Sequence, residues 1–368
     1  MNKEILTSKR MIFLMCMFLF GSTSILGLGS NVEQDTWIAL LTAFVFVIPI
    51  IFMYGRIIRI FPGRDIFDMF QELFGGFFGK VLTIIFVWYC IHLGALILKN
   101  YSEFIVTLQM PETKEIALMI ILIPCIIYIS KKGVNCLSKW ATIIFVIVLF
   151  VAGFTSILSL KHMDFQNILP IAEHGFKDMS RSALNIVLFP FGEIVLFLSF
   201  GKSFNKRDNP YKTYFIAVSI MVFLLLVLVL RNVLVLGAEM HAKELYESYS
   251  AVKVININES LSRFESTISL TFILSCIGKI VVCVLSASKG LSKLVKIDDY
   301  KAFVVPSSVL VLALCSTVYK NAIEMFAFLD EYPMYLISIQ ISIPLLVWIA
   351  AEIKMHKIKK LKPNPTPS

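Results

Sequence analysis

The chain has 368 residues, of which 58% are hydrophobic and only 16% are charged, whereas soluble proteins carry about 25% charged residues. This composition excludes a soluble globular domain and predicts an integral membrane protein that crosses the bilayer several times. The formal net charge is +9, but the basic residues lie in short segments beside apolar runs. That placement is typical of membrane orientation, so no nucleic-acid partner is expected.

Seven cysteines lie mostly inside apolar runs, and none forms a C-x-x-C pair with metal-ligand spacing. The sequence also shows no P-loop, no nucleophile–base pair and no recognisable cofactor motif. We therefore expect no metal, no cofactor and no enzymatic activity.

Ten apolar runs are long enough, or nearly so, to cross a hydrocarbon core of about 30 Å as helices. They cover approximately residues 11–28, 37–54, 81–98, 116–129, 140–160, 183–200, 214–236, 268–285, 303–319 and 332–351. The expected fold class is all-α integral membrane, with one permease-like domain over residues 1–362 and a disordered tail over 363–368. With the N-terminus inside, every inner segment carries at least three basic residues. The positive-inside rule thus predicts that both termini are cytoplasmic.

The first run is unusually rich in small residues near its end. Three glycines and three hydroxyl side chains fall within residues 21–29, the hydroxyls being Ser22, Thr23 and Ser24. Such a composition makes a weak helix, and small residues also let two membrane helices pack closely. Read alone, the segment fits a helix break and a tight helix contact about equally well.

The third run places His92 near mid-depth, beside Tyr89. A lone histidine on a packed helix is usually a hydrogen-bonded core group, and that is the expectation here. Beyond this run, Lys99 and Glu103 are four residues apart, which is the spacing of an ion pair on one helix face.

The sixth run contains a stretch that should interrupt a helix, namely Phe189, Pro190, Phe191, Gly192 and Glu193. Proline removes a backbone donor and clashes with the preceding turn, and the following glycine loosens the same place. A carboxylate at the centre of a bilayer costs about 2.5 kcal/mol or more, so it normally faces protein or water. The pattern fits a broken helix that carries an acid in a substrate site. It also fits a proline kink whose glutamate is hydrogen-bonded within the bundle.

The eighth run carries Lys279 at mid-depth. Either Lys279 and Glu193 share one polar cavity, directly or through water, or they are two separately hydrogen-bonded groups. The interrupted runs, one and six, would each open one half of a five-plus-five inverted repeat. Interrupted segments at corresponding positions of two halves point to a transporter binding site.

Two polar segments lie outside the apolar runs. The longest outer stretch, residues 237–265, predicts a helix around residues 241–249, and it would serve either as a partner surface or as a solvated loop. The basic residues of 354–362 are expected to face anionic lipid headgroups, so the lipid bilayer is itself a partner.

Four short motifs, in this order along the chain, resemble the B subunits of GerA-type spore germinant receptors, the GerAB family. They are Asp35-Thr36-Trp37-Ile38 at the start of run two, Phe191-Gly192-Glu193 at the break in run six, Arg263-Phe264-Glu265-Ser266 before run eight, and Tyr332-Pro333 at the start of run ten. That family is found in endospore-forming bacteria. Its members are permease-like and belong to the amino acid–polyamine–organocation superfamily. The resemblance covers nearly the whole chain.

The resemblance implies a ten-helix, five-plus-five inverted-repeat fold with helices one and six broken, in the spore inner membrane. It implies that an amino acid or other small nutrient binds at the membrane midplane and signals to A-type and C-type receptor subunits. The ligand-binding residues implied are Ser22, Thr23, Ser24, Tyr89, Phe189, Pro190, Phe191, Gly192, Glu193, Gly278 and Lys279. In this arrangement, backbone N–H groups of helix one would meet a ligand carboxylate and Glu193 would hold an ammonium group. Lys279 would replace the cation that other superfamily members bind.

The chain departs from the family in helix one, where Ser22, Thr23 and Ser24 stand in place of glycines. Those side chains narrow the cavity, which implies either a different ligand or a weak pocket that only supports assembly. Two other functions stay open on the sequence alone: a proton-coupled amino acid transporter that uses the same cavity, and a structural membrane subunit.

Overall fold

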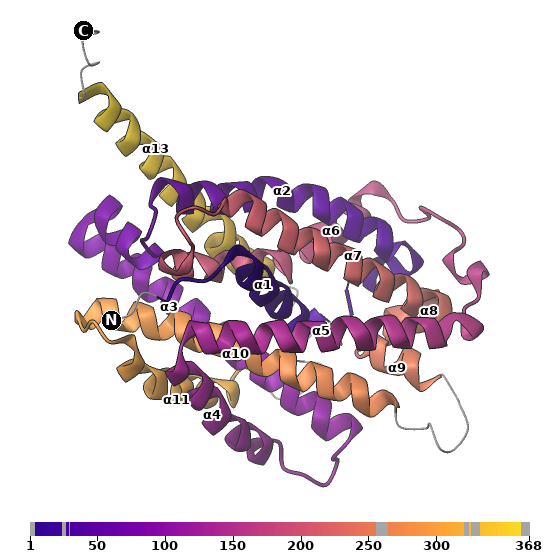
Figure 1. Cartoon of the computed structure of the whole chain (residues 1–368). Helices are drawn as coiled ribbons and strands as arrows, with labels where there is room; N and C mark the ends of the chain where they lie inside the picture. The colour runs from indigo at the N-terminus through magenta and orange to yellow at the C-terminus, as the bar shows by residue number, and fades with distance from the viewer. Residues whose placement is uncertain are drawn as a thin grey trace.

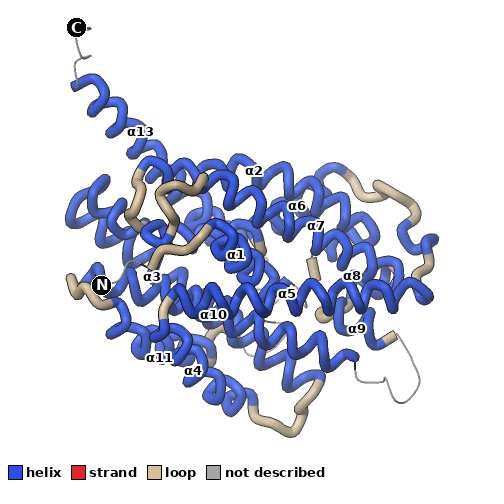
Figure 2. Tube along the Cα trace, viewed as in Figure 1, coloured by secondary structure: helices blue, strands red, loops and turns tan. Residues whose placement is uncertain are grey.

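The computed structural model describes residues 4–23, 27–28, 30–254, 264–319, 324 and 332–361. Figure 2 shows this part of the chain as helices joined by loops that gather at the two ends of the bundle. The described residues contain no β-strand beyond one isolated bridge between Leu6 and Phe204.

The bundle is built from helices whose bounds follow the apolar runs closely. The α-helices are α1 (Ser8–Thr23), α2 (Thr36–Ile60), α3 (Ile66–Leu108), α4 (Glu115–Lys132), α5 (Val134–Ser159), α6 (Phe176–Leu188), α7 (Pro210–Leu236), α8 (Ala238–Lys243), α9 (Glu247–Lys253), α10 (Phe264–Val295), α11 (Val304–Cys315) and α13 (Ile343–Leu361). The 3-10 helices are η1 (Ser30–Asp35), η2 (Leu160–His162), η3 (Phe165–Ile168), η4 (Phe191–Ser203) and η6 (Tyr300–Phe303), and η7 (Ser338–Ser342) is a π turn.

Seven helices in the described part of the chain are long and apolar enough to cross a membrane. They are Asn31–Ile60, Ile66–Leu108, Val134–His162, Phe176–Ser203, Pro210–Leu236, Ser266–Val295 and Tyr332–Lys357. They correspond to the predicted runs two, three, five, six, seven, eight and ten, so the protein is an all-α integral membrane protein. The other three runs form the shorter or more charged helices α1, α4 and α11.

The first helix lies in the middle of the bundle. Figure 1 shows α1 between α2, α6 and α7 on one side and α5 and α10 on the other, and α1 contacts α5, α7 and α10 directly. The pair α3 and α10 is also in extensive contact. Because α10 contacts both α1 and α3, side chains from all three can meet in the interior.

The predicted interruption of the sixth run is confirmed. Helix α6 ends at Leu188, Phe189 adopts an extended backbone with φ −133° and ψ 113°, and the chain resumes as η4 at Phe191. Pro190 has no N–H to donate and clashes with the preceding turn, which explains why the α-helix stops here. The helix starts at Phe176, however, seven residues before the predicted run begins.

The first helix also stops early. Helix α1 ends at Thr23, and neither Gly27 nor Leu28 is helical before η1 begins at Ser30. Ser24, a predicted site residue, lies outside the described residues, and the side chain of Ser22 does so as well. Glycine at 27 and 29 weakens a helix, which accounts for the end of α1 well short of residue 28.

Two local predictions are wrong for reasons of packing. The outer helix predicted at residues 241–249 is two short helices, α8 and α9, that are separated at Glu244–Tyr246. The Nζ of Lys99 bonds both carboxylate oxygens of Glu115, at 2.7 and 2.8 Å, instead of forming the predicted salt bridge with Glu103. The turn between α3 and α4 brings Glu115 back over Lys99, a contact that spacing along one helix does not predict.

Candidate functional site

The break in the sixth span carries a buried ion pair. The Nζ of Lys279 lies 2.5 Å from Oε2 of Glu193, and the two residues are 0% and 1% exposed. Glu193 stands in the first turn of η4, directly after the break, and Lys279 is near the middle of α10. The structure therefore brings the two predicted ionisable residues into one site and excludes two separately hydrogen-bonded groups.

Aromatic rings complete the surroundings of the lysine. Its Nζ lies 5.0 Å from the ring centroid of Phe18 in α1 and 5.5 Å from that of Phe189 in the break. Both distances are within the range of cation–π attraction, which strengthens when the cation is desolvated. Side chains from α1, the break and η4 thus surround the ammonium group that α10 carries.

The energy of this arrangement depends on keeping both charges together. A carboxylate or an ammonium alone in the interior costs several kcal/mol of lost hydration, whereas the pair repays much of that cost through mutual attraction. Removing one partner from a buried pair typically costs about 3–5 kcal/mol. Separating the pair is therefore costly unless another group takes the place of each lost partner.

Glycines let the backbone elements approach closely around the pair. A Cβ atom at Gly21 would lie 3.0 Å from Cβ of Lys279, and one at Gly278 would collide with the side chain of Met17. The thiol of Cys276 also donates to the main-chain oxygen of Gly21 at 2.7 Å. The small residues of run one therefore act as a close helix contact between α1 and α10, in addition to the break beyond Thr23.

Tyr89, predicted from α3, reaches the site through a residue that sequence reasoning missed. Its hydroxyl accepts a hydrogen bond of 2.9 Å from Nε2 of Gln340, which is fully buried in the π turn η7. A Cβ atom at Gly192 would collide with the same glutamine side chain. The one available signal in the sequence was a single amide between Ile339 and Ile341 in an otherwise apolar span.

Some of the remaining predicted site residues lie beside the ion pair, and others lie elsewhere in the bundle. Phe191 and Gly192 are the first two residues of η4 and are both buried, and Pro190 lies in the break directly before them. Thr23 donates to the main-chain oxygen of Leu19 at 2.8 Å and lines a separate, small cavity. His92 packs against the Trp88 ring at 5.9 Å in a cluster of aromatic side chains.

That small cavity belongs to a second buried polar cluster that sequence reasoning did not identify. Arg231, which is 1% exposed, donates to Thr155 and to Asn232. Asn232 and Glu247 line the cavity together with Thr23. The charge of Arg231 falls near the end of the predicted run 214–236, where a basic residue is normally assigned to the flanking loop. Its burial depends on α5 and α9, which no local pattern indicates.

The loop before α6 is held by one carboxylate. Asp35, which is fully buried, accepts backbone N–H groups of Ala172, Glu173 and His174 at 2.8, 2.9 and 3.3 Å. Its Oδ2 also lies 3.1 Å from Nδ1 of His174. A carboxylate with this many donors fixes the loop over the junction between η1 and α2.

The opposite end of the bundle is closed by charges and by the start of the chain. Lys202, at the end of η4, pairs with Asp65 at 2.7 Å and with Asp68 at 2.5 Å, both at the start of α3. The backbone N–H of Leu6 donates to Ser203 at 2.8 Å, and that of Ser8 donates to Asp208 at 2.9 Å. These contacts tie η4 and its following loop to α3 and to the entry of α1.

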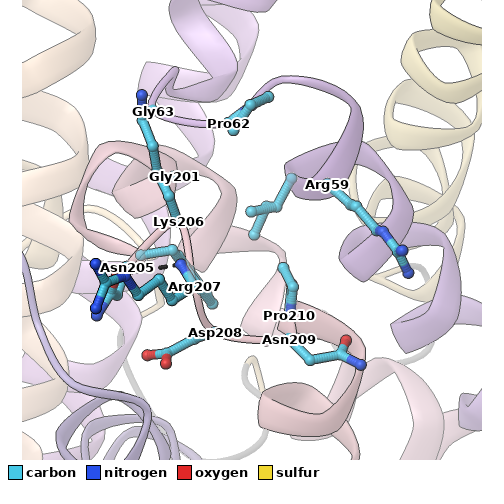
Figure 3. A pocket seen from close by; sticks show the side chains of 12 residues that line it. Arg59, Pro62, Gly63, Gly201, Asn205, Lys206, Arg207, Asp208, Asn209 and Pro210 are labelled. Carbon is cyan, nitrogen blue, oxygen red and sulfur yellow. Dashed lines mark hydrogen bonds between the residues drawn. The ribbon is translucent and has the colours of Figure 1, made fainter.

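A surface pocket of about 280 Å³ opens at the same end, away from the ion pair. Figure 3 shows that Pro62 and Gly63 face the loop of Asn205–Pro210 across it. The basic side chains do not converge on this pocket, because Arg59 extends away from it and lies over the ring of Tyr211 at 5.7 Å. Within the described residues, no group of three His, Cys, Asp or Glu side chains is arranged to hold a metal ion.

Comparison with known sequences gives one consistent result. The profile of the family described as "Spore germination protein" matches residues 5–325. The chain is 23% identical over 367 residues to spore germination protein KB of Bacillus subtilis (strain 168), covering 98% of both chains. It is also 23% identical over 292 residues to spore germination protein GerQB of Bacillus cereus, covering 79% of each.

Comparison with solved structures gives the fold. The chain superposes on Mhp1, a nucleobase-cation-symport-1 family transporter in a closed conformation with bromovinylhydantoin bound, with a TM-score of 0.66. The match covers 93% of this chain and 76% of Mhp1, at 12% sequence identity. At that identity the likeness establishes a transporter fold and says nothing about the ligand.

Proposed function

The chain belongs to the spore germination protein family, and from this premise we propose that it is the B subunit of a nutrient germinant receptor. It binds an amino acid or similar small germinant and signals to A-type and C-type partner subunits to start germination. The observation that carries the proposal is the buried ion pair of Glu193 and Lys279 beside the helix break.

The charges of the pair match those of an amino acid. A zwitterion carries one ammonium and one carboxylate, so it can insert between Glu193 and Lys279 and leave neither charge unpaired. Its ammonium group would bind Glu193, near the rings of Phe18 and Phe189, and its carboxylate would bind Lys279. Tyr89, Pro190, Phe191, Gly192 and Gly278 would complete the walls. Of the hydroxyl residues expected from helix one, Thr23 lines the separate small cavity, and Ser24 and the side chain of Ser22 lie outside the described residues.

Binding would be read out as a change in helix arrangement. Separating Lys279 from Glu193 moves α10 relative to η4, and α10 is in contact with α1 and α3. A ligand shifts such an equilibrium only by its differential affinity for the two arrangements. The ligand would disfavour the arrangement described here, in which Glu193 and Lys279 are in direct contact. It would favour an open arrangement in which the two side chains are apart, and the partner subunits would respond to that arrangement.

We further propose ten spans in two inverted repeats of five, with α1, α4 and α11 as the three short spans. The likeness to a transporter fold supports this topology. In Figure 1 the described residues that lead into α1 and the last turns of α13 lie at the end of the bundle opposite α8 and α9. That placement supports cytoplasmic termini in the spore inner membrane, since basic residues gather at the same end.

Proton-coupled amino acid transport is the second candidate function. The fold neighbour is a transporter, and a buried carboxylate beside a lysine suits proton exchange as well as ligand binding. Uptake of labelled amino acids by vesicles that contain this chain alone would favour transport. Germination without measurable uptake would favour the receptor.

The experiment that tests the proposal is thermal stabilisation of the purified protein, with its partner subunits, by a panel of the twenty common amino acids. A ligand present at a hundred times its dissociation constant should add about 2.7 kcal/mol of stability. The same amino acid should trigger germination of spores that carry this receptor. If no panel member raises the melting temperature, and none triggers germination, the amino acid proposal is wrong.

A further inference from the structure

The tenth span contributes one buried amide to the interior of the bundle. Gln340 is fully buried and lies in the π turn Ser338–Ser342, directly before α13. A π turn inserts an extra residue into a helix and is frequently found at functional sites. Here the insertion directs a polar side chain inward, between α2, α3 and the broken sixth span.

Two tyrosines hold this glutamine at both its main chain and its side chain. The hydroxyl of Tyr54 in α2 donates to the main-chain oxygen of Gln340 at 2.5 Å. The side-chain Nε2 of Gln340 donates to the hydroxyl of Tyr89 in α3 at 2.9 Å. The orientation of the amide is therefore fixed from two helices, which is how a residue is prepared to recognise a ligand.

The other end of the amide faces the helix break. Among the described residues, Oε1 of Gln340 has no hydrogen-bond partner, and a Cβ atom added at position 192 would collide with it. Gly192 precedes Glu193, so the free oxygen is one residue from the acid of the ion pair. A buried acceptor without a partner is destabilising, and a ligand that supplies an N–H group would remove that penalty.

We propose that Gln340 is a specificity-determining residue of the germinant site, and this inference depends on the function proposed above. When a ligand separates Glu193 from Lys279, Oε1 of Gln340 accepts an N–H group of the ligand side chain. The site then selects amino acids with a side-chain amide over amino acids of the same shape with a hydrocarbon side chain. Asparagine and leucine form such a pair, and so do glutamine and methionine.

The test measures dissociation constants of these four amino acids by thermal stabilisation of the purified receptor. In the unmodified protein, asparagine should bind about tenfold more tightly than leucine, and glutamine should bind about tenfold more tightly than methionine. The amide ligand gains one buried hydrogen bond to Oε1 of Gln340 and leaves no acceptor unpaired. In the variant Gln340→Met, both ratios should fall to about one. The variant Gln340→Glu keeps the acceptor and the side-chain length, so it should keep the preference.

The matched control is Tyr54→Phe, which removes a hydrogen bond to the main chain of the same residue and leaves the side-chain amide in place. It should lower the melting temperature without changing either affinity ratio. Equal binding of asparagine and leucine by the unmodified protein would overturn the inference, and so would a Gln340→Met variant that weakens all four ligands alike. Failure of every amino acid to bind would instead refute the proposed function, so the two failures are distinguishable.

Discussion

The substitution Glu193→Gln tests the central pair most directly. It leaves Lys279, which is 0% exposed, with an uncompensated charge among Phe18, Phe189 and the backbone of α1. Breaking a buried pair from one side costs about 3–5 kcal/mol, a large fraction of the stability of an ordinary domain. We expect a lower melting temperature and a loss of germination by amino acids, because the ligand ammonium then has no carboxylate to bind.

A double variant separates the loss of binding from the loss of stability. Glu193→Leu combined with Lys279→Met leaves no charge at the site, and replacing a buried ion pair by well-packed hydrophobic residues of similar volume is often neutral or stabilising. The double variant should therefore recover abundance and melting temperature and still not respond to any amino acid. A merely structural pair predicts that the response recovers along with stability.

The assay combines three measurements on the same spores: abundance of the protein in the membrane, its melting temperature after purification, and the fall in optical density on adding amino acids. Both single variants and the double variant are compared with the unmodified protein. Germination at unchanged amino acid concentrations in Glu193→Gln, with normal abundance, would refute the role assigned to the pair.

Three further predictions address the walls and covers of the site. Gly192→Ala should lower the free energy of unfolding by about 1–3 kcal/mol through overpacking, because the new methyl group meets Gln340. Adding Gln340→Ala should partly restore the melting temperature. An unchanged melting temperature in Gly192→Ala would contradict this packing. Ethylamine and propionate should each bind at least about a hundredfold more weakly than alanine in thermal-stabilisation titrations, since each leaves one buried charge unpaired; equal affinity would mean that the pair does not open. Asp35→Asn should release the loop of residues 172–174, seen as faster hydrogen exchange there with the melting of the bundle little changed; exchange at the original rate would show that the carboxylate is dispensable.

The break and the ion pair were predictable because they violate the composition of a membrane span. Proline, glycine and a charged residue stand out against an apolar background, and each carries a cost that only a specific environment removes. Glu193 and Lys279 are the clearest such residues within the predicted spans, and the structure places them in contact. Their mutual distance did not follow from the sequence, but the cost of two isolated charges favours one shared site.

Gln340 and Arg231 show where sequence reasoning stops. A π turn depends on the packing of the surrounding helices, and nothing in the residues around Gln340 specifies one extra residue in the helix. Arg231 lies near the end of a predicted span, where a basic residue normally marks the flanking segment. Its burial depends on Thr155 and on the fold of α8 and α9, contacts between segments far apart in the chain. Helix periodicity predicts which face of a helix is buried, but it does not identify the helix that packs against that face.

The proposed function requires that the central pair be coupled to contacts at the two ends of the bundle. At one end Asp35 fixes the loop of residues 172–174, and at the other Lys202 joins η4 to Asp65 and Asp68. Glu193 lies in the first turn of η4 and Lys202 in its last turn, so a ligand that moved Glu193 would also move the element that carries Lys202. Lys202 is 43% exposed in these contacts, but Asp65 is 3% exposed, so they are not ordinary surface ion pairs. In the proposed mechanism, the ligand would have to outweigh both these contacts and the separation of the central pair, which costs about 3–5 kcal/mol when one partner is left alone. It could do so only through its greater affinity for the open arrangement.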